Sequence, residues 1–343
     1  RKITVIGAGS WGTSLATVLA YNGYKPVLWM RNAERVEELR ANRMNQQYLP
    51  EIRLPDEIHY ESDAEKALDK VDIVVLAVPT QQVRTLIKTI ATYLPANAIL
   101  VNVAKGIEKG TSCRISQIVE QELGPRHFVV VSGPSHAEEV ALKMPTTLVS
   151  ASKSKMHAEL IQDLFMNQFI RVYTNPDVTG VELAGALKNV VAFGAGISDG
   201  IGYGDNAKAA LMTRGIAEIA RLGQRMGASL TTFAGLAGIG DLIVTCTSMH
   251  SRNRRAGIMV GQGKSLEDTL AEVGMVVEGV YTADAAHGLA RQFDVDMPIT
   301  RSIYQVLYED QPVDQAVQEL MSRNRKHEME EVAVSQMINW PAP

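Results

Sequence analysis

Cysteine is scarce in this chain of 343 residues, which contains only Cys113 and Cys246. Two thiols so far apart cannot form the disulfide framework of a small secreted protein, and their spacing fits no metal-binding motif. We therefore expect no metal site. The composition suits a reducing compartment, and Arg1 and Lys2 lead into a strand pattern rather than a signal peptide, so we expect a cytoplasmic protein.

The chain also lacks a basic surplus and long apolar runs. Its 34 basic and 38 acidic residues give a formal net charge of −4, which argues against nucleic-acid binding but leaves room for a local basic pocket. The longest strand-like run, residues 73–78, is too short to cross a bilayer, so we expect no membrane span. Hydrophobic residues make up 46% of the chain, enough for a sizeable core, and the length suggests two domains.

Two patterns divide the chain. Up to about residue 175, short runs rich in Val, Ile and Leu alternate with helical stretches, which is typical of α/β proteins with a mostly parallel sheet. The strands are predicted at residues 2–6, 26–30, 73–78, 99–103 and 128–131. The first helix is predicted at residues 10–21, and others near 81–92 and 112–122.

From about residue 178 the pattern is helical only. Helices are predicted at residues 181–191, 207–226, 252–260 and 300–308, and glycine clusters at 194–204 and 235–240 are expected to break them. Pro176 can open a helix, which places the boundary near it. We predict an α/β dinucleotide-binding domain over residues 1–177 and an all-helical substrate-binding domain over residues 178–343.

A glycine-rich turn, Gly7-Ala8-Gly9-Ser10-Trp11-Gly12, lies between the first predicted strand and the first predicted helix. Gly7 permits the tight turn, Gly9 lets backbone approach a pyrophosphate, and Gly12 lets helix and strand pack closely. The free N–H groups and the positive dipole end of the helix favour an anion there. The context predicts a dinucleotide site.

The second strand lacks the carboxylate that usually binds the 2′-hydroxyl of NAD and ends instead in Trp29-Met30-Arg31. The guanidinium of Arg31 matches a 2′-phosphate. We therefore expect NADP(H), with NAD(H) tolerated. The alternative is that Arg31 is a solvated surface residue.

Lys188 is the main candidate for acid–base chemistry. It follows a small, apolar stretch from Leu183 to Leu187, and desolvation lowers the pKa of a lysine toward working pH. A helix lysine that reaches solvent is the alternative. Lys105 and the Gly133-Pro134-Ser135 stretch each follow a predicted strand, at the sheet edge where such folds bind ligands. Asp241 ends a glycine-rich stretch and could pair with a lysine.

A basic run opens a later helix, with Ser251 as a plausible N-cap and Arg252 and Asn253 in the first turn. Cations there oppose the helix dipole, and a bound anion relieves that conflict. The run favours a site for a small phosphate; a solvated basic face is the alternative.

These motifs together resemble the bacterial NAD(P)-dependent glycerol-3-phosphate dehydrogenase family. The resemblance covers residues 3–326 and is carried by the glycine-rich turn with Thr13 and by five further stretches in the same order: Ala104-Lys105-Gly106, Ser132-Gly133-Pro134-Ser135, Glu182 to Asn189, Gly238 to Leu242 and Ser251 to Arg254. It implies a Rossmann domain, a helical domain like that of 6-phosphogluconate dehydrogenase, and reversible reduction of dihydroxyacetone phosphate to sn-glycerol 3-phosphate for phospholipid synthesis.

The resemblance also implies roles for individual residues. Lys188 matches the catalytic acid/base of the family, and Lys105 and Asp241 match its active-site partners. The implied substrate-binding residues are Lys105, Gly133, Ser135, Lys188, Asn189, Asp241, Thr245, Ser251, Arg252 and Asn253. The implied cofactor-binding residues are Gly7, Gly9, Ser10, Trp11, Gly12, Arg31, Lys105, Ala137, Arg252, Val276 and Glu278. Trp11 stands where many members carry another aromatic residue.

Two alternatives stay open at this point. The first is another enzyme of the same architecture, such as a 6-phosphogluconate or 3-hydroxyacyl-CoA dehydrogenase, although a lysine, an aspartate and an arginine favour a small phosphorylated ketone. The second is a catalytically silent dinucleotide sensor, although Lys188 and Arg252 are both present. The sequence does not determine the oligomeric state, and a homodimer is one option.

Overall fold

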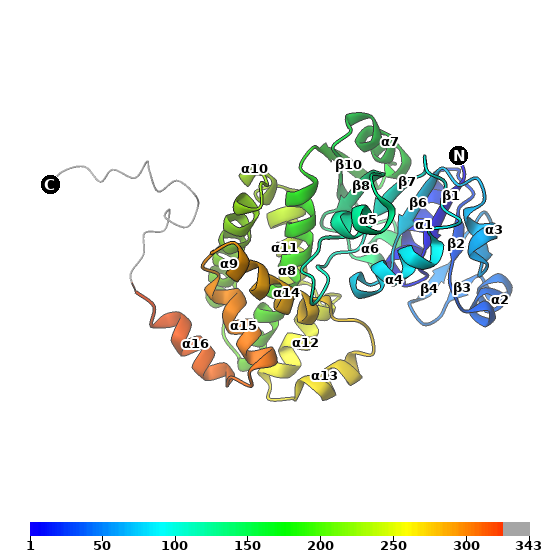
Figure 1. Ribbon diagram of the computed structural model, residues 1–343. Coiled ribbons are helices and arrows are strands. Elements are labelled where there is room, and N and C mark those ends of the chain that lie inside the picture. Colours follow the sequence, from blue (N-terminus) through cyan, green and yellow to red (C-terminus); the bar gives the residue numbers. More distant parts are fainter. Residues whose placement is uncertain (325–343) are drawn as a thin grey trace. The chain divides into compact units, whose positions relative to one another are not determined.

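The computed structural model describes residues 1–324, which form two compact units (Figure 1). The first unit contains residues 1–105 and 113–182, and the second contains residues 106–112 and the chain from residue 183 onward. The chain therefore passes between the units three times, at residues 105/106, 112/113 and 182/183.

The first unit is built on an eight-stranded sheet, with the strand order β10-β9-β8-β7-β6-β1-β2-β5. All pairs are parallel except β8 with β9, so the predicted mostly parallel sheet is confirmed. The strands are β1 (Ile3–Ile6), β2 (Val27–Trp29), β5 (His59–Glu61), β6 (Ile73–Leu76), β7 (Ile99–Asn102), β8 (His127–Ser132), β9 (Thr146–Ala151) and β10 (Ile170–Asn175). A separate hairpin pairs β3 (Met44–Asn45) with β4 (Leu49–Arg53).

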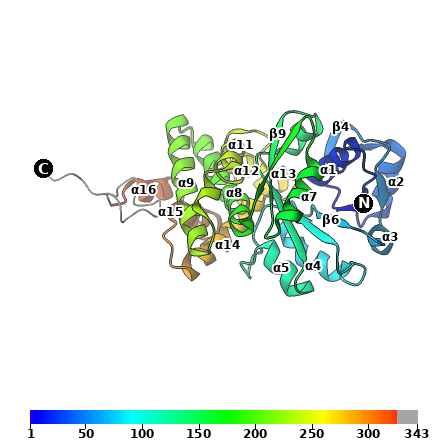
Figure 2. The same cartoon turned by 90° about the horizontal axis from the view of Figure 1, so that it is seen from above.

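Helices cover both faces of this sheet, as the view from above shows (Figure 2). One core contains side chains of α1 (Ser10–Tyr21), α2 (Ala33–Asn42) and α7 (Lys155–Phe165). The core on the other face contains side chains of α3 (Ala64–Leu68), α4 (Thr80–Ile90) and α5 (Ile115–Leu123). The short helix α6 (Ala137–Ala141) packs against α1. Burial on both faces explains why β6 is a continuous apolar run and why all four residues of β1 are buried, Thr4 included.

The second unit is helical, and its longest helix, α8 (Val178–Ile201), is almost entirely buried in it from Leu183 to Ile197. Around it lie α9 (Asp205–Arg225), α10 (Leu230–Phe233), the π-helical turn η1 (Leu236–Gly240), α11 (Asp241–Thr247), α12 (Arg252–Gly261), α13 (Leu266–Val273), α14 (Glu278–Gln292), α15 (Pro298–Tyr308) and α16 (Val313–Met321). Ile107 is fully buried in the hydrophobic core of these helices, so residues 106–112 belong to this unit.

The expectation that glycines at 194–204 break the helix is wrong for residues 194–200, because α8 continues to Ile201. These glycines serve packing instead. A Cβ on Gly196 would lie 2.1 Å from the carbonyl oxygen of Arg254, and one on Gly257 would lie 2.1 Å from that of Phe193. The backbones of α8 and α12 therefore touch, which a larger residue would prevent. At 235–240 the helix is indeed interrupted, by η1.

The predicted domain limits, 1–177 and 178–343, differ in detail from the two units. The first unit ends five residues later, inside α8, and residues 106–112 belong to the second. Residues 325–343 of the predicted second domain, and residues 325–326 of the family resemblance, lie outside the described part. The assignment of one function to each domain stays a prediction.

Two stretches reach the length and mean hydropathy of a membrane span, Val178–Ile201 and Leu230–Thr247. The premise that no apolar stretch is long enough therefore does not hold for these two, by length and composition alone. The most apolar window of the first stretch is completely buried, as in a core helix, and that of the second is 44% buried. Neither stretch is strong evidence for a span.

The contact between α8 and α12 predicts that Gly257→Ala destabilises the protein. A Cβ so close to the Phe193 carbonyl forces the helices apart, at a cost of about 2 kcal/mol or more in the free energy of unfolding. Urea denaturation measures this. Gly204→Ser is the matched control, since no heavy atom lies within 4 Å of a Cβ there and serine is a good N-cap. Equal stability of the two variants would contradict the packing role.

Candidate active site

The glycine-rich turn joins β1 to α1 as predicted. Gly7 has a φ of +110°, and a Cβ there would lie 2.5 Å from the carbonyl oxygen of Ala77. A Cβ on Gly12 would lie 1.9 Å from the carbonyl oxygen of Gly7, so both positions require glycine. The turn thus holds the start of α1 tightly against the sheet.

The same turn has the features of an anion cradle. Gly9 is the N-cap of α1, and a Cβ on it would meet nothing within 4 Å, so its outer face is open. Among the described residues, no side chain caps this helix and no acidic residue lies in its first turn. The indole Nε1 of Trp11 is buried and has no hydrogen-bond partner in the described part of the chain. These residues, with Ser10, fit a dinucleotide pyrophosphate.

Arg31 lies two residues after the end of β2 at Trp29 and is exposed. No carboxylate follows that strand, since the next residue, Asn32, accepts a hydrogen bond from the Arg35 backbone and caps α2. This geometry is compatible with both a phosphate contact and a solvated arginine, so the NADP(H) preference stays a prediction.

Other predicted residues of the first unit meet at the carboxyl end of the sheet. Lys105 follows β7, and its Nζ donates a 2.8 Å hydrogen bond to the Gly133 carbonyl, to which the Ser135 hydroxyl also donates, at 3.0 Å. Gly133 has a φ of +128°, which favours glycine. Ala137 begins α6, and its carbonyl accepts a hydrogen bond from Ser14 of α1. The structure thus brings together Lys105, Gly133 and Ser135.

Lys188 is buried in the second unit, with only 5% of its surface exposed, and does not reach solvent as a surface lysine would. Its Nζ lies 2.5 Å from Oδ1 of Asp241 and donates a 2.6 Å hydrogen bond to the Thr245 hydroxyl. That hydroxyl donates to the Asp241 backbone carbonyl one helical turn earlier. The predicted pairing of Lys188 with Asp241 is therefore present, on helices α8 and α11.

Such a pair is costly to bury, since each charge loses its hydration and only good geometry offsets the loss. The second hydrogen bond to Thr245 helps to satisfy the ammonium. Cys246 is also fully buried nearby, and burial raises the pKa of its thiol to about 12, so it is protonated and unsuited to nucleophilic chemistry.

A second polar group lies beside Lys188 along α8. The Asn189 side-chain carbonyl accepts a hydrogen bond from Nδ2 of Asn253, and Oδ1 of Asn253 accepts one from the Gly279 backbone N–H. Val276 lies just before α14 and Glu278 is its first residue, so the bond from Gly279 ties the start of α14 to α12 and, through Asn189, to α8. Sequence reasoning missed Gly279, because a backbone donor has no signature in the residue pattern.

The basic run begins α12 as predicted. Ser251 is buried and its hydroxyl accepts a hydrogen bond from the Arg254 backbone N–H, so the predicted N-cap is confirmed. Arg252 is exposed in the first turn, and Asn253 is buried. Two further ion pairs were not predicted: Asp199 of α8 binds Arg254 of α12 and Lys208 of α9, each at 2.8 Å. The pair with Arg254 adds to the anchoring of α12.

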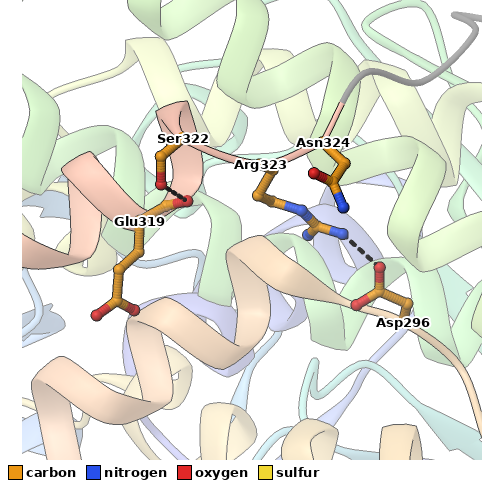
Figure 3. A pocket seen from close by; sticks show the side chains of 5 residues that line it. All are labelled: Asp296, Glu319, Ser322, Arg323 and Asn324. Atoms are coloured by element: carbon orange, nitrogen blue, oxygen red, sulfur yellow. Dashed lines mark hydrogen bonds and ion pairs between the residues drawn. The ribbon is translucent and has the colours of Figure 1, made fainter.

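The predicted residues do not line either of two cavities in the helical unit. One, of about 450 Å³, lies at the C-terminal side of the helical unit, where Arg323 binds Asp296 beside Ser322, Glu319 and Asn324 (Figure 3). The other is lined by residues of the same region, from His287 to Arg301. Among residues 1–324, no group of three or more His, Cys, Asp or Glu residues could hold a metal ion.

Comparisons with known proteins cover both units. Residues 2–158 match the family model described as "NAD-dependent glycerol-3-phosphate dehydrogenase N-terminus", and residues 177–318 match the corresponding C-terminus model. A glycerol-3-phosphate dehydrogenase, NAD(P)+, of Geobacillus thermodenitrificans is 56% identical over 335 residues, 97% of this chain and 98% of the relative. One of Bacillus subtilis is 51% identical, with 97% of each chain covered.

A solved structure agrees with these matches. The crystal structure of glycerol-3-phosphate dehydrogenase from Coxiella burnetii superposes with a TM-score of 0.91 at 38% sequence identity. It covers 94% of this chain and 99% of its own. The similarity thus extends over nearly the whole of both proteins.

The buried pair predicts strong coupling between Lys188 and Asp241. Lys188→Met or Asp241→Asn alone leaves one group buried without its partner, and we expect each to lower the free energy of unfolding by about 3–5 kcal/mol. The double variant is expected to lose clearly less than the sum of the two, since no uncompensated charge remains. Urea denaturation of all four proteins measures this coupling. Additive losses would show that the two groups do not interact.

Proposed function

The chain belongs to the NAD-dependent glycerol-3-phosphate dehydrogenase family, and from that premise we propose that it reduces dihydroxyacetone phosphate reversibly to sn-glycerol 3-phosphate. The product serves glycerophospholipid synthesis. The observation in the molecule that supports this most directly is the buried Lys188–Asp241 pair, because ketone reduction needs a proton donor beside the reacting oxygen. Two observations support the use of a dinucleotide: the similarity of the chain to NAD(P)+-dependent relatives and the anion cradle at the start of α1.

The proposed chemistry assigns a separate task to each group. The reduced dinucleotide, when bound, supplies the hydride. Lys188 donates a proton from Nζ to the oxygen that becomes the new hydroxyl, and Asp241 keeps that lysine charged beforehand. Thr245 holds Nζ in place through its second hydrogen bond. Lys105 adds positive charge that stabilises the developing alkoxide.

Binding of the substrate phosphate is assigned to Arg252 and Asn253 at the start of α12. The exposed guanidinium of Arg252 and the helix N-terminus both attract a dianion. Gly133, Ser135, Asn189 and Ser251 complete the proposed substrate set. Since Asn253 already uses its carbonyl for Gly279 and one N–H for Asn189, it retains one N–H for a ligand. Phosphate binding remote from the ketone orients the reacting carbon.

The proposed cofactor set is Gly7, Gly9, Ser10, Trp11, Gly12, Arg31, Lys105, Ala137, Arg252, Val276 and Glu278. We propose a preference for NADP(H) over NAD(H) because Arg31, and no carboxylate, follows β2. We also propose a cytoplasmic location, supported by the scarcity of cysteine, since the chain has only Cys113 and Cys246, far apart in sequence. A homodimer stays a prediction, which sedimentation can test.

The function is tested by the loss of nicotinamide absorbance when dihydroxyacetone phosphate is added with NADPH and, separately, with NADH. We expect turnover with both and a higher rate with NADPH at limiting cofactor. Lys188→Met should lower kcat at least about a hundredfold while NADPH still binds, since general acid catalysis contributes that much. Arg252→Ala should mainly raise the KM for the substrate.

Lys155→Met is the control for loss of a lysine, because that side chain is 86% exposed on α7. Two results would overturn the proposal. A folded wild-type protein that binds NADPH but oxidises none of it with dihydroxyacetone phosphate would favour another substrate or a sensor. Turnover near the wild-type rate in Lys188→Met would remove the lysine from the chemistry.

A further inference from the structure

A buried asparagine contacts the glycine-rich turn from a distant part of the sequence. Asn45 lies on β3, in the hairpin that follows α2, and is 1% exposed. Its Nδ2 donates a 3.0 Å hydrogen bond to the Ala8 carbonyl and a 2.8 Å hydrogen bond to the Thr13 hydroxyl. Ala8 lies inside the turn and Thr13 in the first helical turns behind it, so one amide links both sides of the proposed pyrophosphate cradle.

The orientation of this amide is determined by its third contact. Arg35 of α2 donates a 3.0 Å hydrogen bond from Nη2 to Oδ1 of Asn45. The oxygen therefore faces a cation and the nitrogen faces two oxygens, which is the only satisfactory arrangement of the amide. Arg35 is itself held by Gln47, at 2.8 Å, and lies over the ring of Tyr48. Asn45 thus belongs to a small polar network between α2, the hairpin and the turn.

The contact with Ala8 restricts a peptide that is otherwise easily rotated. The Ala8 carbonyl and the Gly9 N–H belong to one planar trans peptide, so they point in opposite directions. Glycine flanks Ala8 on both sides, which leaves this plane few steric restraints. When Asn45 holds the carbonyl, the Gly9 N–H must point away from Asn45. That N–H makes no hydrogen bond within the described part of the chain.

We propose that Asn45 is a positioning residue for the dinucleotide pyrophosphate. It draws the Ala8 carbonyl oxygen away from the cradle, where a carbonyl would repel phosphate, and presents the Gly9 N–H to the pyrophosphate instead. This inference rests on the proposed dinucleotide dependence. Arg35 acts indirectly, because its hydrogen bond to Oδ1 of Asn45 leaves Nδ2 facing the turn.

The test compares two ligands that differ in the pyrophosphate. Asn45→Ala should raise the Kd for NADPH about tenfold, the effect of losing one well-placed hydrogen bond. It should leave the Kd of 2′-AMP, which carries the adenosine and the 2′-phosphate but no pyrophosphate, within about twofold. Both constants are measured by titration of the purified protein, with 2′-AMP in competition with NADPH. In turnover, the KM for NADPH should rise, with kcat and the KM for the ketone nearly unchanged.

Asn45→Asp is the second variant, because it keeps the size of the side chain and the bond from Arg35 but places an acceptor against the Ala8 carbonyl. It should weaken NADPH binding at least as much as Asn45→Ala. Gln46→Ala is the control, since Gln46 is the next residue of the hairpin, is exposed, and its side chain bonds to the Met44 sulfur and to neither Arg35 nor the turn among the bonds of the described chain. It should bind NADPH like the wild type.

Two outcomes would overturn the inference. Equal loss of NADPH and 2′-AMP affinity would mean that Asn45 only supports the local fold, and an unchanged Kd for NADPH in both Asn45 variants would mean that it has no role in binding. Failure of the proposed function looks different, because the wild-type protein itself would then not bind NADPH or not turn over.

Discussion

The packing of the helical unit depends on the burial of one lysine, Lys188. An ammonium group at this depth is tolerated only with an anion beside it, so Lys188 on α8 requires Asp241 on α11. This requirement fixes how α11 lies against α8. Direct backbone contact between α8 and α12 then fixes the third helix, because glycines such as Gly196 and Gly257 leave no room for sliding. The proposed catalytic and phosphate-binding residues therefore have a rigid common support.

In the first unit, the main constraint is that backbone N–H groups of the glycine-rich turn must point toward an anion. Packing of α1 against the sheet requires glycine at Gly7 and Gly12, while Gly7 and Gly9, on either side of Ala8, leave the peptide between Ala8 and Gly9 few steric restraints. Asn45 limits that freedom from outside the turn. Preorganised N–H groups bind phosphate without the cost of ordering them first.

Much of this arrangement could be predicted from local patterns. The α1 helix has the predicted limits, Ser10–Tyr21, and the five predicted strands lie within two residues of β1, β2, β6, β7 and β8. Three strands of the same sheet were missed. β5 has only three residues, and Thr, Ser and Arg stand among the apolar residues of β9 and β10. The glycines of α8 were misinterpreted as helix breakers because local propensity, about 1 kcal/mol for a glycine, was weighed without the partner helix that offsets it.

The site was predictable where one stretch carries the signal and not where distant residues meet. The turn from Gly7 to Gly12 and the N-cap Ser251 were identified locally. The contacts of Asn45 with Ala8 and of Asn253 with Gly279 join residues 37 and 26 positions apart, and no periodicity indicates them. The Lys188–Asp241 pair was anticipated because both residues lie in small-residue stretches and because both match active-site residues of the family that the sequence resembles.

The central claim is that Lys188, kept charged by Asp241, is the proton donor in ketone reduction. The pH dependence of kcat in the wild type and in Asp241→Asn tests it most directly. Because an adjacent anion favours the charged form of a lysine, its removal should move the high-pH limb of the profile to lower pH. A limb at the same pH in both proteins, with turnover retained in the variant, would contradict the account.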